Sequence, residues 1–335
     1  FFQTYSVTVN YKVAFLVGKN QEKSARFFWQ WSRKRSLFLS FIISGIWLLS
    51  TPLLMRFFNI PVASPFLMFT PLIILSILAA NDRGILKGKF SFGVIAIMTL
   101  GDPITRLLST LFLTITGNYN YLYLTIPLGI FAAFAIGSIV AHKRNPVVKE
   151  KIGMDFPFRF WTISILGAIS GIAFFSLDNI LASHFLTPRE VGQYALLGIL
   201  GKMLFFIGSI TSGFLLPIVA RNEGKQVSST KVFYSLLALI TGMSFFGYIV
   251  FALAPAYLSP LYLGVKMRAI APYLPLYGLG VFFFTVSQTF VSYHLAKKEY
   301  SFPLTAFVLT VFEVLLFSLG KHTLSTLVMT MSLFG

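Results

Sequence analysis

Long apolar segments separated by short polar breaks run through the whole chain. We place them at residues 1–17, 36–57, 61–81, 90–116, 119–142, 158–184, 189–220, 230–256, 268–296, 301–319 and 322–335. Most are long enough to cross the hydrocarbon core of a bilayer, which takes about 20 apolar residues in a helix. The pattern predicts an all-α, multi-pass integral membrane protein without an inserted soluble domain.

Two of the polar breaks carry local signals. The sequence Thr187-Pro188-Arg189-Glu190 matches an S/T-x-x-E capping box with proline in the first turn, so it predicts the start of a helix. The segment WQWSRKR at 29–35 fits either an interfacial amphipathic helix at anionic lipid heads or a plain aromatic belt. The sequence leaves both readings open.

Composition supports the membrane assignment. The 335 residues are 56% hydrophobic and 11% charged, whereas a soluble domain has about 25% charged residues. The chain has no cysteine, which excludes disulfides, and it has no Walker-type loop for ATP hydrolysis. Its histidines lie far apart at predicted membrane edges, without a metal-binding spacing. We therefore expect no cofactor, no metal and no enzymatic activity.

Loops rich in basic residues alternate with loops that have few. Of the 27 Lys and Arg residues, nineteen fall in one set of loops, five in the opposite set and three inside spans. The positive-inside rule places the richer set in the cytoplasm, including residues 19–35, 143–159 and 221–231. The net charge of +17 thus reflects topology, and no nucleic-acid partner is needed to explain it.

An internal repeat divides the chain. The segment LVGKNQEKSARFF (16–28) corresponds to VARNEGKQVSSTKVF (219–233), and ILKGKFSF (85–92) corresponds to LAKKEYSF (295–302), at offsets of 203 and 210 residues. Such duplications are common in transporters, with the substrate site between the halves. We predict two pseudo-symmetric six-helix lobes, 1–150 and 151–335, around a cavity. In this scheme the first helix and part of the second precede Phe1, and the last helix is cut.

Three stretches resemble one transporter family. They are LDNILASHFLTPREVGQYALLG (177–198) with LLPIVAR (215–221), LAANDRGILKGKFSF (78–92), and LYLGVKMRAIAPYLPLYGLG (261–280). Together they resemble polysaccharide flippases of the MOP exporter superfamily, although Met267 or Arg268 stands where an aromatic residue is usual. The resemblance implies a monomeric cell-membrane transporter that flips a polyprenyl-pyrophosphate-linked oligosaccharide to the outer leaflet by alternating access.

Ionisable residues inside spans are the candidate site residues. Each costs roughly 2.5–3.5 kcal/mol at a helix centre, so it should face a protein interior or a watery cavity. The candidates for binding the substrate phosphate are, in order, Lys202, Arg106 and Lys12. The candidates for a coupling proton or sodium ion are Asp178, Glu313 and Asp102.

Each candidate also has a structural alternative. Asp102 and Arg106 are four residues apart and can neutralise each other, Asp178 can be interfacial, and Lys12 can reach the inner surface. Lys202 and Glu313 lack a partner on their own helix but can pair between helices. Lys202 ranks first because it shares a stripe with Gly198 and Ser209 that leaves room beside it. Replacing Lys202 by Ala should therefore abolish export, whereas the same change at Arg189 in an outer loop should be nearly silent.

Two other functions compete with flipping. A drug or cation antiporter of the related MATE branch needs the same architecture. A membrane glycan polymerase or ligase would need a substantial outer-face region, and the short outer loops count against it.

Overall fold

The computed structural model describes residues 2–58, 61–150, 152–209, 212–253, 269–319 and 323–334, and within these ranges it contains helices and turns but no strand. Four basic residues of the topology count, Lys151, Lys266, Arg268 and Lys321, lie outside the described residues. The helices form two compact units. The all-helical fold predicted from the apolar pattern is therefore confirmed.

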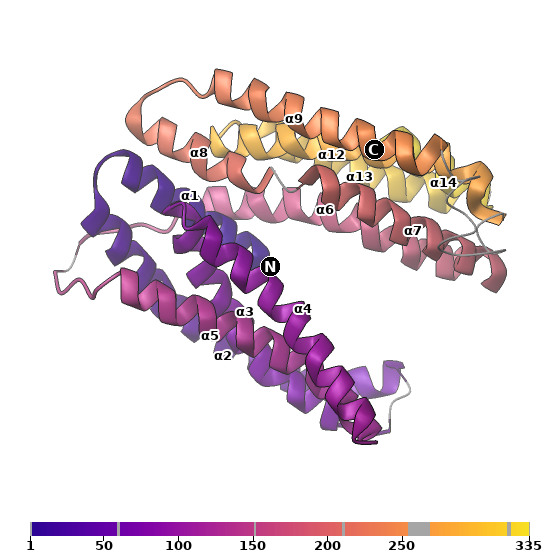
Figure 1. The fold of residues 1–335 in the computed structure, drawn as a ribbon, viewed down its shortest axis with the longest axis horizontal. Coiled ribbons are helices and arrows are strands. Elements are labelled where there is room, and N and C mark those ends of the chain that lie inside the picture. The colour runs from indigo at the N-terminus through magenta and orange to yellow at the C-terminus, as the bar shows by residue number, and fades with distance from the viewer. Residues whose placement is uncertain are drawn as a thin grey trace. The chain divides into compact units, whose positions relative to one another are not determined.

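The first unit runs to Trp161 and also takes in Ala220–Gln226. It contains α1 (Phe2–Gly18), α2 (Glu22–Phe58), α3 (Ser64–Gly88), α4 (Phe92–Ile115) and α5 (Thr125–Arg144). Helix α3 is at the centre, because it packs against α1, α2 and α5, while α4 lies alongside α5 (Figure 1). Buried side chains such as Val9, Phe28 and Ile85 form its core.

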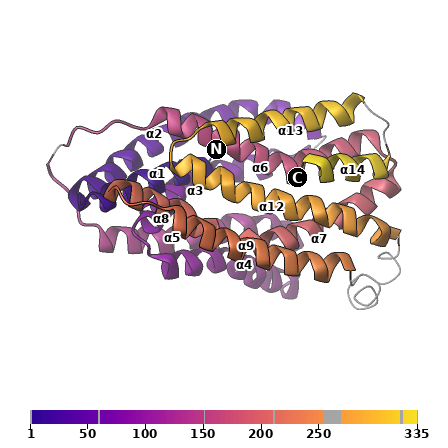
Figure 2. The ribbon, with the colours of Figure 1, turned by 90° about the horizontal axis from the view of Figure 1, so that it is seen from above.

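The second unit comprises Thr162–Val219 and the chain from Val227 onward. Its helices are α6 (Phe158–Phe185), α7 (Pro188–Ser209), α8 (Ser212–Lys225), α9 (Thr230–Tyr248), α12 (Leu274–Ala296), α13 (Ser301–Leu319) and α14 (Leu324–Phe334). Helix α12 is central, and it packs against α7, α9, α13 and α14 (Figure 2).

Neither unit is one continuous stretch of the chain. Residues 152–161 and the end of α8 belong with the first unit. Helices α6 and α8 therefore each contain residues of both units.

Eight helices among the described residues are long and apolar enough to cross a membrane. A ninth span, α6, bends by 46° between Phe158–Phe174 and Ser176–Phe185. These helices make the chain a multi-pass membrane protein.

Helix α2 is longer than the predicted span 36–57. Its 37 residues extend for about 55 Å, whereas the hydrocarbon core is about 30 Å thick. The WQWSRKR segment is therefore the first part of the same helix rather than a separate interfacial element. Trp29 points into the core, and Lys34 and Arg35 are exposed.

The capping box between α6 and α7 is present. The Thr187 backbone N–H donates to Glu190 Oε2 at 3.1 Å, and the Glu190 backbone N–H donates to Thr187 Oγ1 at 3.4 Å. These reciprocal bonds satisfy two helix-end donors, as the sequence predicted.

The same left-handed turn ends a helix at four places. Asn20, Phe90, Gln226 and Lys298 have φ values of 59°, 58°, 59° and 62°. After α1, α3 and α12, the next backbone N–H bonds to a carbonyl five residues earlier, as in a Schellman motif. The turns at Asn20 and Gln226 are 206 residues apart, and those at Phe90 and Lys298 are 208 apart. The backbone thus repeats with nearly the period of the sequence repeat.

The C-terminal ends of α1 and α8 cross at two glycines in the first unit. A Cβ atom on Gly18 would collide with the backbone oxygen of Arg221, and one on Gly224 would collide with that of Phe15. The contact is reciprocal, since a shift of 206 residues converts Phe15 into Arg221 and Gly18 into Gly224. The two helix ends are therefore related by a local two-fold axis.

Candidate functional site

Asp178 lies just after the bend of α6 and is 3% exposed. Tyr194 of α7 donates its hydroxyl hydrogen to Asp178 Oδ2 at 2.7 Å. Asn179 donates its backbone N–H at 2.6 Å and its side-chain amide at 3.1 Å to Asp178 Oδ1. The carboxylate is thus enclosed by hydrogen-bond donors inside the second unit.

Glu313 of α13 is the second buried carboxylate of this unit, 8% exposed. It lines a cavity of about 250 Å³ whose walls include Phe174, Phe284 and Gln288. A smaller cavity is lined by both Asp178 and Glu313, and the two carboxyl groups interact electrostatically. The helices therefore bring together two of the residues that the sequence singled out for ion coupling.

The chemistry of this pair suits a proton or an alkali cation. Two acids in one dry region repel each other when both are ionised, so a bound cation or proton relieves the repulsion. Among the residues described, no group of three or more His, Cys, Asp or Glu side chains gathers as a metal site. Thr310 and Thr330 also line the smaller cavity and add hydroxyl oxygens to its wall.

Lys202 lies on α7, half-buried, and interacts electrostatically with Asp178. A Cβ on Gly198, one turn before Lys202, would lie at an ordinary contact distance of 3.6 Å from the Asn179 amide. A Cβ on the neighbouring Gly201 would press against Tyr277, so this glycine allows α12 to approach α7 closely.

The other candidates lie in the first unit. Arg106 donates Nε–H and Nη2–H to the two carboxylate oxygens of Asp102 at 2.6 and 3.0 Å. This bidentate pair lies directly against Gly129 of α5, where any side chain would clash with it. The structure therefore shows the mutual neutralisation that the four-residue spacing allowed. Lys12 lies half-buried on α1, six residues before its end.

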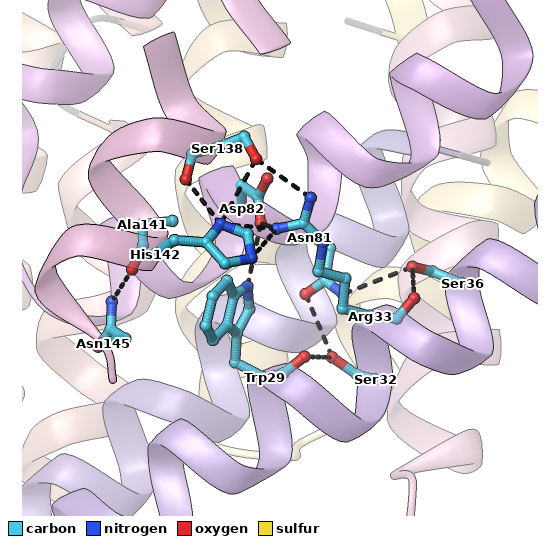
Figure 3. A network of polar contacts seen from close by, with 10 residues as sticks. All are labelled: Trp29, Ser32, Arg33, Ser36, Asn81, Asp82, Ser138, Ala141, His142 and Asn145. Atoms are coloured by element: carbon cyan, nitrogen blue, oxygen red, sulfur yellow. Dashed lines mark hydrogen bonds and ion pairs between the residues drawn. The ribbon is translucent and has the colours of Figure 1, made fainter. Parts of the chain in front are cut away.

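A buried polar network in the first unit was missed by the sequence analysis (Figure 3). Asp82 of α3 is completely buried and accepts hydrogen bonds from Trp29 Nε1 at 3.1 Å and from Arg33 Nη1 at 3.0 Å. Arg33 also donates from Nη2 to Ser138 Oγ at 3.1 Å, and its Nη1 lies 3.0 Å from His142 Nε2. The network joins α2, α3 and α5.

The network was missed because the span 61–81 was ended at the first charged residues. Helix α3 continues to Gly88, so Asp82 and Arg83 are helical rather than part of a loop. Hydrogen bonds from an arginine and an indole N–H on neighbouring helices replace the hydration of this carboxylate. The helix can therefore continue through Asp82. His142, which the sequence left as a lone interfacial histidine, packs its ring 5.0 Å from that of Trp29.

Comparisons with known proteins identify the fold. No protein-family model matches the sequence, and no curated protein matches it. The structure is similar to that of the MATE transporter ClbM in complex with Rb+, with a TM-score of 0.77 and 12% identity over 99% of this chain and 80% of that chain. The chain therefore has the fold of a MATE transporter.

Proposed function

We propose that this chain is an ion-coupled flippase of the cell membrane that moves a polyprenyl-pyrophosphate-linked oligosaccharide to the outer leaflet. The cargo is inferred from the flippase-like sequence motifs, and the transport mode is inferred from the fold. The observation that carries the coupling is that Asp178, just after the bend of α6, and Glu313 of α13 line the same small cavity. Interrupted helices with buried carboxylates are typical of ion sites in secondary transporters. We propose that the protein works as a monomer.

Lys202 links the ion to the cargo in this mechanism. When Asp178 is ionised and empty, it attracts the Lys202 ammonium group. A proton or sodium ion on Asp178 removes that attraction, so Lys202 becomes available to an anionic group of the cargo. Ion binding thereby raises the affinity of the second unit for the cargo, which is a coupling between two ligands.

Transport of lipid-linked oligosaccharide into proteoliposomes under a proton or sodium gradient tests the proposal. The Asp178→Asn and Glu313→Gln variants keep the shape of the site but lose its charge, so flux should become independent of the gradient. Lys202→Ala should abolish flux, and Arg189→Ala, which also removes one positive charge, should leave it nearly unchanged. Full gradient dependence in both carboxylate variants would refute ion coupling at this site.

A MATE-like antiporter of drugs or organic cations is the second candidate. The observation that favours it is the structural similarity to ClbM, whose structure contains Rb+. Ethidium efflux from the same proteoliposomes separates the two functions. Gradient-driven ethidium efflux without movement of the lipid-linked sugar would establish the antiporter instead.

A further inference from the structure

Two cations lie one turn apart on α3, Arg83 and Lys87, where the sequence analysis expected a cytoplasmic loop. Both lie in the last two turns of a helix that is long and apolar enough to cross a membrane, and both are half-buried. The Nε atom of Arg83 is completely covered and has no hydrogen-bond partner among the described residues. A buried guanidinium N–H without an acceptor is unfavourable, so a ligand that supplies an acceptor oxygen would be stabilised here.

The acids that could neutralise this pair are engaged elsewhere. All ten Asp and Glu residues lie in the described ranges, and none forms an ion pair with Arg83 or Lys87 there. Asp82, the neighbour in sequence, accepts hydrogen bonds from Trp29 and Arg33 at Oδ1 in the network of Figure 3, and its buried Oδ2 has no hydrogen-bond partner among the described residues. Asp102 acts on Arg83 from a distance, but both of its oxygens are bound by Arg106.

The helix therefore keeps the positive charges of Arg83 and Lys87 close together, although they repel each other. The charged group that acts on Lys87 is Arg83, a like charge. The negative end of the helix dipole favours a cation in the last turn, where Lys87 lies, but this effect falls off within one turn and does not reach Arg83 fully. Two adjacent cations that form no ion pair with any acid among the described residues match a ligand that carries two negative charges.

We infer that Arg83 and Lys87 form a binding site for a pyrophosphate group, the first contact of the cargo at the end of the first unit predicted to face the cytoplasm. This inference rests on the proposed function. The guanidinium group offers paired N–H donors to phosphate oxygens, and the ammonium group adds a point charge beside them. The site is separate from Lys202, which belongs to the second unit.

The test is binding of inorganic pyrophosphate to the protein in detergent, followed as a rise in melting temperature. The parent should be stabilised in a saturable way, because a ligand that binds the folded state raises its stability. Arg83→Gln and Lys87→Gln should each weaken binding by about tenfold or more, since each removes a charged contact to phosphate. Lys34→Gln removes an exposed cation of α2 and should bind like the parent.

Stability without ligand separates this role from a structural one. If the pair exists for an anion, Lys87→Gln should raise the melting temperature of the ligand-free protein, because it removes the repulsion. The charge-conserving Lys87→Arg should retain pyrophosphate binding. A lower melting temperature in Lys87→Gln, with pyrophosphate stabilising the variant as much as the parent, would overturn the site.

Two further experiments distinguish a lipid headgroup from the cargo as the source of the phosphate, and test the anion site separately from the flippase activity. Displacement of pyrophosphate by phosphatidylglycerol at equal concentration would overturn the assignment to cargo in favour of a lipid headgroup. Full flux of lipid-linked oligosaccharide in the Arg83→Gln, Lys87→Gln double variant would overturn the site while leaving the flippase intact. Pyrophosphate binding that depends on both residues in a protein without such flux would refute the flippase and retain the anion site.

Discussion

At the scale of single residues, the Asp82–Arg33 pair is the most enclosed ion pair among the described residues. The exposed fractions of the two side chains are 0% for Asp82 and 19% for Arg33, at a distance of 3.0 Å. Such a pair is expensive to desolvate, and it is tolerated because Trp29 and Ser138 supply further hydrogen bonds. Removing one partner of the pair should therefore lower the free energy of unfolding.

We predict that Asp82→Asn lowers the free energy of unfolding by about 3–5 kcal/mol, because it leaves the Arg33 charge buried without a counter-charge. Denaturant unfolding in detergent measures this loss. The matched control is Glu150→Gln in the exposed Lys23–Glu150 pair, which should change stability little. The double variant Asp82→Asn, Arg33→Gln should be more stable than Asp82→Asn alone. A double variant that is less stable than either single variant would contradict this account.

The site residues were predictable to different degrees. The Asp102–Arg106 pair could be read from its spacing, because residues four apart meet on one helix. The grouping of Asp178, Tyr194 and Glu313 could not, since it depends on how α6, α7 and α13 pack. The sequence identified the acids by their cost in a membrane but gave no information about their partners. It missed Asp82 for the opposite reason, because a charge beside other charges was read as a loop.

At the scale of elements, the corner between α12 and α13 is closed by a side-chain bond as well as by its left-handed turn. His294 Nδ1 and Glu299 Oε2 lie 2.5 Å apart, and the imidazole stacks on Phe302 with ring centroids 3.7 Å apart. The hydrogen bond with His294, followed by the nearby Lys297, holds the pKa of Glu299 below its ordinary value. A carboxylate with a lowered pKa in the folded state stabilises that state only while it is ionised.

The stability of the protein should therefore depend on Glu299 in a defined direction. We predict that the parent is more stable than Glu299→Gln at neutral pH. The difference should shrink as the pH falls below about 4.3, the ordinary pKa of a glutamate, and disappear below the lowered pKa of Glu299 in the folded state. Melting curves of both proteins between pH 7 and pH 3.5 measure it. A difference that stays constant across this range would show that the bond depends on shape rather than on charge.

Most element boundaries followed from hydrophobicity, and the exceptions share one cause. The predicted span 301–319 coincides with α13, which carries only the buried Glu313 as a charged residue. Helices α2 and α3 extend well beyond their predicted spans at the end predicted to be cytoplasmic. The helices continue through charged residues there, and the buried Asp82 of α3 forms an ion pair with Arg33 of α2.

At the scale of the whole molecule, the chain passes between the two units within α6 and within α8. The second passage depends on the crossing of α1 and α8, where the backbones approach closely at Gly18 and Gly224. A side chain at either position would have to displace a backbone carbonyl, which is a stiff obstacle.

We predict that Gly224→Ala lowers the free energy of unfolding by about 1–3 kcal/mol through overpacking. Gly213→Ala on the same helix is the matched control, because no atom lies within 4 Å of its added Cβ. That control should be neutral or slightly stabilising, as alanine is the better helix former. Melting temperatures in detergent compare the two. Equal stability of the variants would mean that the crossing relaxes without cost.

The reciprocal form of this crossing points to the history of the chain. In a symmetric homodimer, a contact between residue i of one subunit and residue j of the other is always accompanied by the contact between j of the first and i of the second. The contacts of Gly18 with Arg221 and of Phe15 with Gly224 follow this pattern. An ancestor of half the present length would have made this junction by self-association, with a single glycine serving both copies. Duplication of such a half within one gene would make the junction intramolecular and leave each glycine separately mutable. Two separately expressed halves of the present chain should accordingly find each other through this junction.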